Sequence, residues 1–328
     1  MLLSTVIPAY NIEKFIRPAV ESVLSQNFRD MEVIVVDDGS TDSTAESVAS
    51  ICDDRLRIIR QSNKGLAGAR NSGIENSQGK YIAILDGDDV WFPGKIEKQI
   101  SLMEQDAAIG FTYTYSAYID EHGAHTGQLW ITTVQEPTFM DLIIRNHVMA
   151  SSVVVRKDCF SQAGLFNEKL RACEDQEQWV RILYKTGYKG RLIPEVLTGY
   201  RVRSDSLTMN FEHQMANVQK VMEIFAANIP QFSRKIKNRS MSEAYRIVSR
   251  KALSGGQLKE AGLLMNEALR ICPSLVLRDP RAFVTFMLVT LPRILPESWQ
   301  FVPYNWTRAF LKLFYRCVDH NRARHINA

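Results

Sequence analysis

Lys80-Tyr-Ile-Ala-Ile-Leu-Asp-Gly-Asp-Asp-Val90 joins an apolar run directly to three carboxylates. Residues 81–85 have the length and the branched and aromatic content of a buried strand. In open α/β sheets, ligands collect at the carboxyl ends of the strands. Carboxylates that stand close together there repel one another and favour a hard cation, Mg²⁺ or Mn²⁺, although Asp and Gly are also ordinary turn residues. The stretch therefore predicts either a metal site or an acidic turn.

Strands and helices alternate on both sides of this stretch. The predicted strands are 3–7, 32–36, 57–59, 81–85, 111–118, 152–155 and 195–203. Apolar residues recur at helical spacing in the intervals, and the predicted helices are 15–24, 43–51, 66–76, 94–103 and 173–185. This alternation predicts an α/β fold, a mostly parallel, Rossmann-like sheet covered by helices on both faces.

Length and composition set the broad class. The chain has 328 residues, 45% of them apolar and 23% charged, which fits a globular protein of roughly two domains. Its five cysteines show no CxxC spacing, so they indicate neither a zinc site nor a disulfide framework and fit a reducing cytosol. The first residues run directly into a predicted strand without the features of a signal peptide. A cytoplasmic protein is therefore expected.

The pattern changes after Asn210, which predicts two domains, 1–210 and 211–328. Only helical patterns follow this point. Residues 211–328 hold 18 Lys and Arg against 8 Asp and Glu, a net charge of +10, whereas residues 1–210 hold 22 against 28, a net charge of −6. Such a basic region suits an anionic lipid surface or nucleic acid, although solvated helix faces also explain scattered Lys and Arg.

Two apolar stretches in the second domain, 282–291 and 306–317, leave their role open. Neither reaches the roughly 20 residues that a membrane-spanning helix needs. The first interpretation is that they pack in a helical core. The alternative is that they lie in a membrane interface as amphipathic helices, with Trp299 and Trp306 as interfacial residues.

Acidic residues stand at three predicted strand or helix ends, which points to a common ligand. The motifs around them are Val6-Ile7-Pro8-Ala9-Tyr10-Asn11, Val35-Val36-Asp37-Asp38-Gly39-Ser40, Asn63-Lys64-Gly65, Ala69-Arg70-Asn71-Ser72-Gly73, Leu85-Asp86-Gly87-Asp88-Asp89 and Glu174-Asp175 with Trp179. Together they resemble the family 2 glycosyltransferases of the bacterial polysaccharide-biosynthesis type, which have the GT-A fold. The resemblance covers roughly residues 3–205.

The resemblance implies an inverting transfer of a sugar from a nucleotide-sugar donor, most often a UDP-sugar, to an acceptor hydroxyl. Asp88 would ligate a divalent cation, Mg²⁺ or Mn²⁺, and Asp86 would hold the ribose or a metal-bound water. Asp38 would accept a hydrogen bond from the uracil ring, although a helix-capping turn is the alternative. The residues that would line the base are Pro8, Ala9 and Tyr10.

Asp175 is the predicted general base, which would remove the proton of the acceptor hydroxyl. Successive helical residues diverge by about 100 degrees, so Glu174 is not expected to face the acceptor. Partial burial would have to raise the pKa of the base toward the working pH, and compensation of the helix dipole is the alternative role. Lys64 and Arg70 could balance phosphate charge or lie on a solvated helix face. Arg203 stands where many relatives have a His; it cannot ligate a metal and is predicted to contact the diphosphate.

The acceptor implied by the resemblance is a glycan or a lipid-linked sugar at the cytoplasmic face of the membrane. Peripheral membrane contact through the basic region is the corresponding expectation, with nucleic acid not expected as a partner. A sugar-phosphate nucleotidyltransferase is one alternative, but it would need a Gly-rich basic loop where Pro8-Ala9-Tyr10-Asn11 stands. A non-catalytic nucleotide-sugar-binding protein is another, but it predicts a missing acid, and all three acidic sites are intact.

Overall fold

The computed structural model of the chain describes residues 1–203 and 211–294, which fall into two compact units. Unit 1 comprises Met1–Leu142 and Asn146–Arg203. Unit 2 comprises Ile143–Arg145 and Ser204–Ala328, of which residues 211–294 are described after the short segment. The sequence pattern suggested a single division after Asn210. It contained no signal that three residues from the middle of the chain pack with the C-terminal helices.

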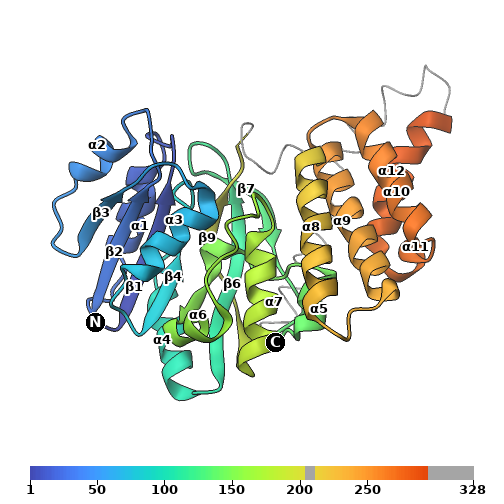
Figure 1. Cartoon of the computed structure of the whole chain (residues 1–328). Helices are drawn as coiled ribbons and strands as arrows, with labels where there is room; N and C mark the ends of the chain where they lie inside the picture. The colour runs from blue at the N-terminus through green and yellow to red at the C-terminus, as the bar shows by residue number, and fades with distance from the viewer. Residues whose placement is uncertain (204–210, 295–328) are drawn as a thin grey trace. The chain divides into compact units, whose positions relative to one another are not determined.

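Unit 1 is built on a sheet that has nine strands among its described residues (Figure 1). The spatial order is β3 (Leu56–Arg60), β2 (Met31–Asp37), β1 (Leu3–Ala9), β4 (Tyr81–Ile84), β8 (Val154–Arg156), β6 (Ile109–Ile119), β9 (Lys189–Arg201) and β5 (Val90–Trp91), with β7 (His125–Trp130) paired to β6. The first four strands in this order are parallel. Beyond β4 the sheet is mixed, because β8 is antiparallel to both of its neighbours while β6 and β9 are parallel.

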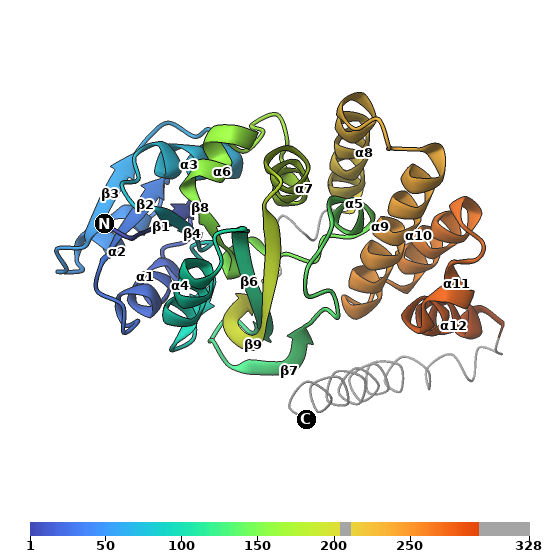
Figure 2. The same cartoon turned by 90° about the horizontal axis from the view of Figure 1, so that it is seen from below.

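Helices cover both faces of the parallel strands. The helical elements of this part of the chain are α1 (Ile16–Leu24), α2 (Thr44–Ala49), α3 (Gly65–Glu75), α4 (Lys95–Gln105), α5 (Phe139–Ile144), the 3₁₀ turn η1 (Ala150–Ser152), α6 (Lys157–Ala163) and α7 (Glu174–Thr186). Figure 2 shows α1 and α4 on one face and α3 and α6 on the other. Side chains alternate along a strand, so Leu3 and Ile7 of β1 join the core on the α1 and α4 side.

The opposite face of β1 carries Val6, which meets Gly73 of α3. A Cβ on Gly73 would lie 2.2 Å from Cγ1 of Val6, so the glycine lets α3 approach the strand closely. The register pairs Val6 with Ile84 and Ala9 with Asp37. The carboxyl ends of β1, β2 and β4 therefore reach the same edge of the sheet, where their loops converge.

Unit 2 is helical throughout its described residues. Its longer helices are α8 (Phe211–Asn228), α9 (Arg234–Ser254), α10 (Leu258–Ile271) and α12 (Pro280–Ile294), with the short α11 (Leu275–Arg278) before the last. The hairpin of α9 and α10 turns at Gly255 and Gly256. Its core joins side chains of α9, α10 and α12, including Val248, Met265 and Val289.

The apolar run 282–291 contributes one face to the core of unit 2. Ala282 and Val289 are fully buried in the helical core, as the first interpretation predicts, whereas Phe283 is 50% exposed; contact with a membrane interface stays a prediction. The second stretch, 306–317, lies outside the described residues, as do Trp299 and Trp306. Among the helices in the described part of the chain, none is long and apolar enough to cross a membrane.

Candidate active site

The loop after β4 carries Asp86, Asp88 and Asp89 at the carboxyl edge of the sheet. Asp89 is buried: the hydroxyl of Ser151 donates to its Oδ2 (2.5 Å), and the backbone N–H of Arg201 donates to its Oδ1 (2.8 Å). The Ser151 hydroxyl also accepts a hydrogen bond from the backbone N–H of Asp86 (3.1 Å). Burial, with the charges of Asp88 and Asp86, raises the pKa of Asp89 well above its ordinary value. Asp89 therefore fixes the loop.

Asp86 and Asp88 remain partly exposed, with side chains 25% and 26% accessible. Oδ1 of Asp86 accepts a hydrogen bond from Arg70 (2.6 Å), and Oδ2 of Asp88 accepts one from Arg203 (3.1 Å). Although the Asp88 side chain is not fully covered, burial raises its pKa; the charge of Asp86 adds to the rise and Arg203 opposes it. Each of these two hydrogen bonds uses one of the two oxygens of its carboxylate.

Arg70 of α3 lies at the centre of the site and is buried. Its NH1 donates to Oε1 of Glu174 (2.6 Å) and its NH2 to Oδ1 of Asp86 (2.6 Å), while Phe166 lies against the guanidinium group (5.4 Å to the ring centroid). Burial alone would lower the pKa of Arg70, but the two carboxylates raise it above its ordinary value. Arg70 thereby ties the loop after β4 to the start of α7. A contact with a donor diphosphate stays a prediction, and it would compete with both carboxylates.

Asp175 follows Glu174 at the start of α7 but takes a different environment. Its Oδ2 accepts a hydrogen bond from the side chain of Asn146 (2.9 Å), and its Oδ1 accepts one from the backbone N–H of Gln176 (2.7 Å). Burial and the neighbouring charge of Glu174 raise the pKa of Asp175 to about 7, while Arg70 opposes the rise. Glu174 is engaged with Arg70, so the two neighbours diverge as expected from helical geometry.

Asp38, at the end of β2, holds the start of α3. Its carboxylate accepts hydrogen bonds from the backbone N–H groups of Lys64 (2.9 Å) and Gly65 (2.8 Å) and from the side chain of Gln61 (2.7 Å). The first N–H groups of a helix have no partner within the helix, so Asp38 caps α3. A carboxylate offers about four acceptor positions, and the hydrogen bonds from described residues use three of them. The contact of Asp38 with uracil stays a prediction. The same carboxylate would have to accept the hydrogen bond from uracil while it caps α3.

The remaining predicted donor-binding residues are grouped around this cap. Pro8 and Ala9 are buried in β1, and Tyr10, just beyond it, is 49% exposed. The carbonyl of Ala9 accepts a hydrogen bond from the backbone N–H of Asp38 (2.9 Å), which joins the loops after β1 and β2. The side chain of Lys64 is exposed at the N-terminus of α3. Their contacts with a donor stay predictions.

Three further residues shape the site although the sequence did not single them out. Asn146 orients Asp175, and Ser151 connects Asp86 with Asp89. Arg201 donates through its Nε to the backbone carbonyl of Asp88 (2.6 Å) in addition to its contact with Asp89. Arg201 lies two residues before Arg203 in the predicted strand 195–203, so a signal was available for it. Asn146 and Ser151 stand in a segment without a periodic pattern.

The strand order and the acidic edge define a GT-A fold. The structure of S. aureus TarS residues 1–349 in complex with UDP-GlcNAc superposes with a TM-score of 0.63 at 17% identity, covering 88% of this chain and 90% of that one. A mannosyltransferase from Pyrobaculum calidifontis in complex with GDP-Man and Mn²⁺ has a TM-score of 0.58 at 17% identity, with 96% and 86% covered. At these identities the likeness concerns the fold.

Sequence comparison gives the family. The model described as glycosyl transferase family 2 matches residues 4–161. The Escherichia coli protein named UDP-Glc:alpha-D-GlcNAc-diphosphoundecaprenol beta-1,3-glucosyltransferase WfaP is 33% identical over 224 residues, which are 68% of this chain and 86% of that protein. This chain belongs to glycosyl transferase family 2. An uncharacterized glycosyltransferase of Rickettsia felis is 37% identical over 57% of this chain, and the chain spans only 31% of that longer relative.

Proposed function

We propose that this chain is an inverting glycosyltransferase that moves a sugar from a UDP-sugar to a hydroxyl of a glycan or lipid-linked acceptor. The observation that carries the proposal is the state of Asp175, a carboxylate held by two hydrogen bonds with its pKa raised to about 7. A general base works best when its pKa lies near the operating pH. The membership in family 2 supports the reaction class.

In the proposed reaction, Asp175 accepts the proton of the acceptor hydroxyl as its oxygen attacks the anomeric carbon. The new glycosidic bond forms on the face opposite the diphosphate, and the bond from the anomeric carbon to the diphosphate oxygen breaks. The electron pair of that bond leaves with the nucleoside diphosphate, so the configuration at the anomeric carbon inverts. Asn146 keeps the carboxylate oriented, and the Glu174–Arg70 pair keeps the neighbouring charge away from the acceptor.

The donor would lie at the carboxyl edge of the sheet, with its base near Ala9, Tyr10 and Asp38. Relatives support a nucleotide-sugar donor: the WfaP name specifies UDP-Glc, and the TarS structure contains UDP-GlcNAc. Arg203 lies two residues beyond the end of β9 and is hydrogen-bonded to Asp88, and its guanidinium group could exchange the carboxylate for a donor phosphate. In this proposal the transfer takes place at the cytoplasmic face of the membrane, where a lipid-linked acceptor of the kind named for WfaP would be met, and contributes to a surface polysaccharide.

A divalent cation fits the donor set of Asp86 and Asp88. Among residues 1–203 and 211–294, no group of three or more Asp, Glu, His or Cys side chains is arranged to hold a metal. Mg²⁺ and Mn²⁺ sites with nucleotides commonly use one or two carboxylates and take their other ligands from phosphate and water. Asp86 and Asp88, two carboxylates of one loop, match that arrangement; burial and the charge of Asp86 raise the pKa of Asp88. The cation would stabilise the charge that develops on the departing diphosphate.

The test begins with a panel of nucleotide-sugars in Mn²⁺, since a bound donor raises the melting temperature by mass action. With the selected donor, Asp175→Asn should lower the rate of sugar transfer by about 10²- to 10⁴-fold, the range for loss of a general base, and leave donor affinity in calorimetry unchanged. The matched control is Asp54→Asn, at an exposed carboxylate. Full transfer by Asp175→Asn would refute the base assignment.

The same preparation tests the cation. Chelation with EDTA should abolish the stabilisation by the donor, and Mn²⁺ should restore it, because the charges of the diphosphate and of Asp86 and Asp88 would otherwise repel. Donor binding that persists after complete chelation would exclude a cation at these aspartates. Release of pyrophosphate from a nucleoside triphosphate and a sugar phosphate would instead identify a nucleotidyltransferase.

A further inference from the structure

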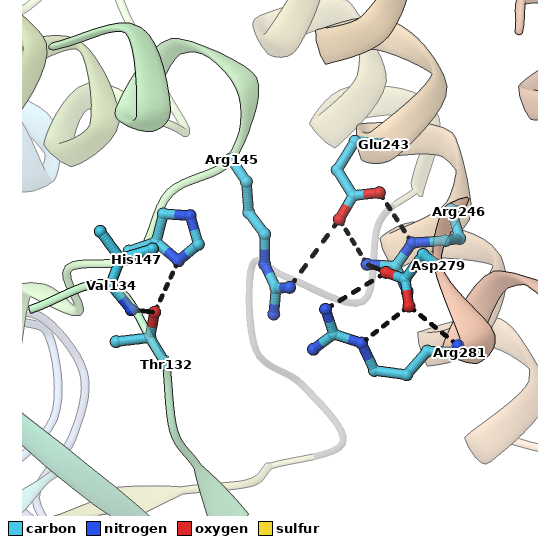
Figure 3. A network of polar contacts seen from close by, with 8 residues as sticks. All are labelled: Thr132, Val134, Arg145, His147, Glu243, Arg246, Asp279 and Arg281. Atoms are coloured by element: carbon cyan, nitrogen blue, oxygen red, sulfur yellow. Dashed lines mark hydrogen bonds and ion pairs between the residues drawn. The ribbon is translucent and has the colours of Figure 1, made fainter. Parts of the chain in front are cut away.

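Unit 2 contains a cluster of five charged side chains that the proposed transfer reaction does not use (Figure 3). Its members are Arg145, Glu243, Arg246, Asp279 and Arg281. All of them belong to unit 2, because Arg145 lies in the short segment that packs with the C-terminal helices. Three guanidinium groups face two carboxylates, so the cluster has a formal charge of +1.

Two of the three arginines each form an ion pair with one of the two carboxylates. Arg246 is buried and donates from Nε and NH2 to the two oxygens of Glu243 (2.8 and 2.6 Å). Arg281 donates from Nε and NH2 to the two oxygens of Asp279 (3.1 and 3.2 Å). These bidentate pairs use the strongest geometry that a guanidinium group and a carboxylate can form.

Arg145 holds the excess charge. Its NH1 lies 3.9 Å from Oε1 of Glu243, which is beyond hydrogen-bonding distance, and its buried Nε has no hydrogen-bond partner among the described residues. Burial lowers the pKa of Arg145 to about 10, and the positive charges of Arg281 and Arg246 contribute to the shift. Glu243, which lies 3.9 Å from Arg145, is already bound through both oxygens by Arg246, so a further anion would stabilise the guanidinium group of Arg145.

The positive charge of Arg145 is not needed to attach residues 143–145 to the helices of unit 2. The hydroxyl of Ser240 donates to the backbone carbonyl of Ile143 (2.7 Å), so the segment is attached to α9 by a neutral hydrogen bond. The side chains of Arg145 and Arg281 are 18% and 20% exposed, so a ligand can reach them from solvent. In Figure 3 both guanidinium groups point toward the same region beside the Glu243–Arg246 pair.

We propose that Arg145 and Arg281 form a binding site for a phosphate-type anion, the diphosphate of a lipid-linked acceptor. The planar fork of a guanidinium group matches the oxygens of a phosphoryl group, and two such groups suit a diphosphate. This choice of ligand rests on the proposed function, in which a lipid-linked sugar is the acceptor. The name of the WfaP relative specifies a diphosphoundecaprenol acceptor of this chemical class.

Calorimetry with the full chain in EDTA tests the site, using inorganic pyrophosphate and farnesyl diphosphate as probes and sodium sulfate at matched ionic strength as the reference. Arg145→Gln should weaken binding of both probes at least tenfold. The matched control is Arg270→Gln, which removes an arginine of α10 that pairs with Glu267 and is 73% exposed; it should change affinity less than twofold. Equal binding by wild type and Arg145→Gln, or sulfate binding as tightly as pyrophosphate, would overturn the site.

A second variant changes affinity in the opposite direction, which loss of folding cannot imitate. Asp279→Asn removes a carboxylate and raises the formal charge of the cluster to +2. Asp279 also accepts a hydrogen bond from the backbone N–H of Arg281 (2.8 Å) at the start of α12, and asparagine caps a helix as well as aspartate does. The variant should bind pyrophosphate severalfold more tightly, and unchanged or weaker binding would contradict the proposal.

The two probes separate the sources of the anion. Farnesyl diphosphate binding at least as tightly as pyrophosphate would support a lipid-linked ligand, whereas tenfold weaker binding would exclude it. UDP-sugar binding in Mn²⁺, measured on the same variants, reports on the donor site of unit 1. If the chain binds pyrophosphate through Arg145 but binds no nucleotide-sugar, the proposed function is refuted and the anion site is retained. If the chain binds a nucleotide-sugar but Arg145→Gln leaves pyrophosphate binding unchanged, the anion site is refuted and the proposed function is retained.

Discussion

Asp175 and Glu174 are adjacent carboxylates with different hydrogen-bond partners. Glu174 is bonded to the buried guanidinium group of Arg70, whereas Asp175 has neutral hydrogen-bond donors and feels the charge of Glu174. Arg70 holds Glu174 by a hydrogen bond; burial and the charge of Glu174 raise the pKa of Asp175, and the positive charge of Arg70 opposes that rise. The arrangement separates a structural acid from a reactive one at two consecutive positions.

The pH dependence of transfer should reveal this arrangement. Asp175 is a base only when deprotonated, so kcat/KM should rise with pH through a midpoint near 7. The hydrogen bond from Asn146 favours the charged form, so Asn146→Ala should move the midpoint upward by about one unit. The control is Asn76→Ala, at an exposed residue beyond α3. A profile whose midpoint does not move would show that Asn146 has no influence on the base.

Individual site residues could be predicted only where a recognisable motif stands at the end of a strand or at the start of a helix. Asp86, Asp88 and Asp175 follow an apolar run or open a periodic helix, so their place at the sheet edge could be read from the pattern. Asn146 and Ser151 contact them from a segment without periodicity, and their role depends on how the chain returns to the sheet.

The helix α3 connects the predicted nucleotide side of the site with the acidic centre. Asp38 caps its first N–H groups, and Arg70 lies a turn and a half further along, where it bonds Asp86 and Glu174. Gly73 lets the helix lie close to β1. Movement of this helix would therefore displace the carboxylates of two other elements.

Asp38→Ala tests the capping role in the absence of any nucleotide. Loss of the cap leaves the N–H groups of Lys64 and Gly65 without their acceptor, which should cost about 2 kcal/mol. Local opening of α3 should accordingly become roughly 30-fold more frequent, and hydrogen exchange of its amide groups faster by that factor. Asp54→Ala is the control. Unchanged exchange together with lost UDP binding would mean that Asp38 serves the ligand alone.

The elements themselves were largely predictable, and their pairing was not. Apolar runs predicted β1, β2 and β4, because strands buried on both faces are largely apolar. The antiparallel insertion of β8 between β4 and β6 depends on contacts between residues some 70 positions apart, which no local pattern encodes. β5, with two residues, is too short to produce a periodic signal.

At the scale of the whole molecule, charge is unevenly distributed along the chain. Residues 1–210 have a net charge of −6 and residues 211–328 a net charge of +10. The start of α9 concentrates part of the excess, with four basic residues and no acidic residue among its first six, Arg234, Lys235, Lys237 and Arg239. Basic side chains at a helix N-terminus oppose the helix dipole, so their presence there is unfavourable for the helix itself. An external anionic surface would offset that cost.

The full chain should therefore bind vesicles that contain phosphatidylglycerol and not vesicles of phosphatidylcholine alone. Each basic residue near an anionic membrane contributes about 1 kcal/mol, so reversal of the exposed Arg234, Lys235 and Arg239 to Glu should weaken binding by roughly tenfold or more. Binding should also fall steeply between about 0.1 and 0.5 M salt, because ions screen exposed charges. The matched control reverses Lys14, Arg29 and Lys80, exposed basic residues of the acidic unit. If both triple variants lose binding equally, attraction depends on total charge, and the basic region has no special part in membrane contact.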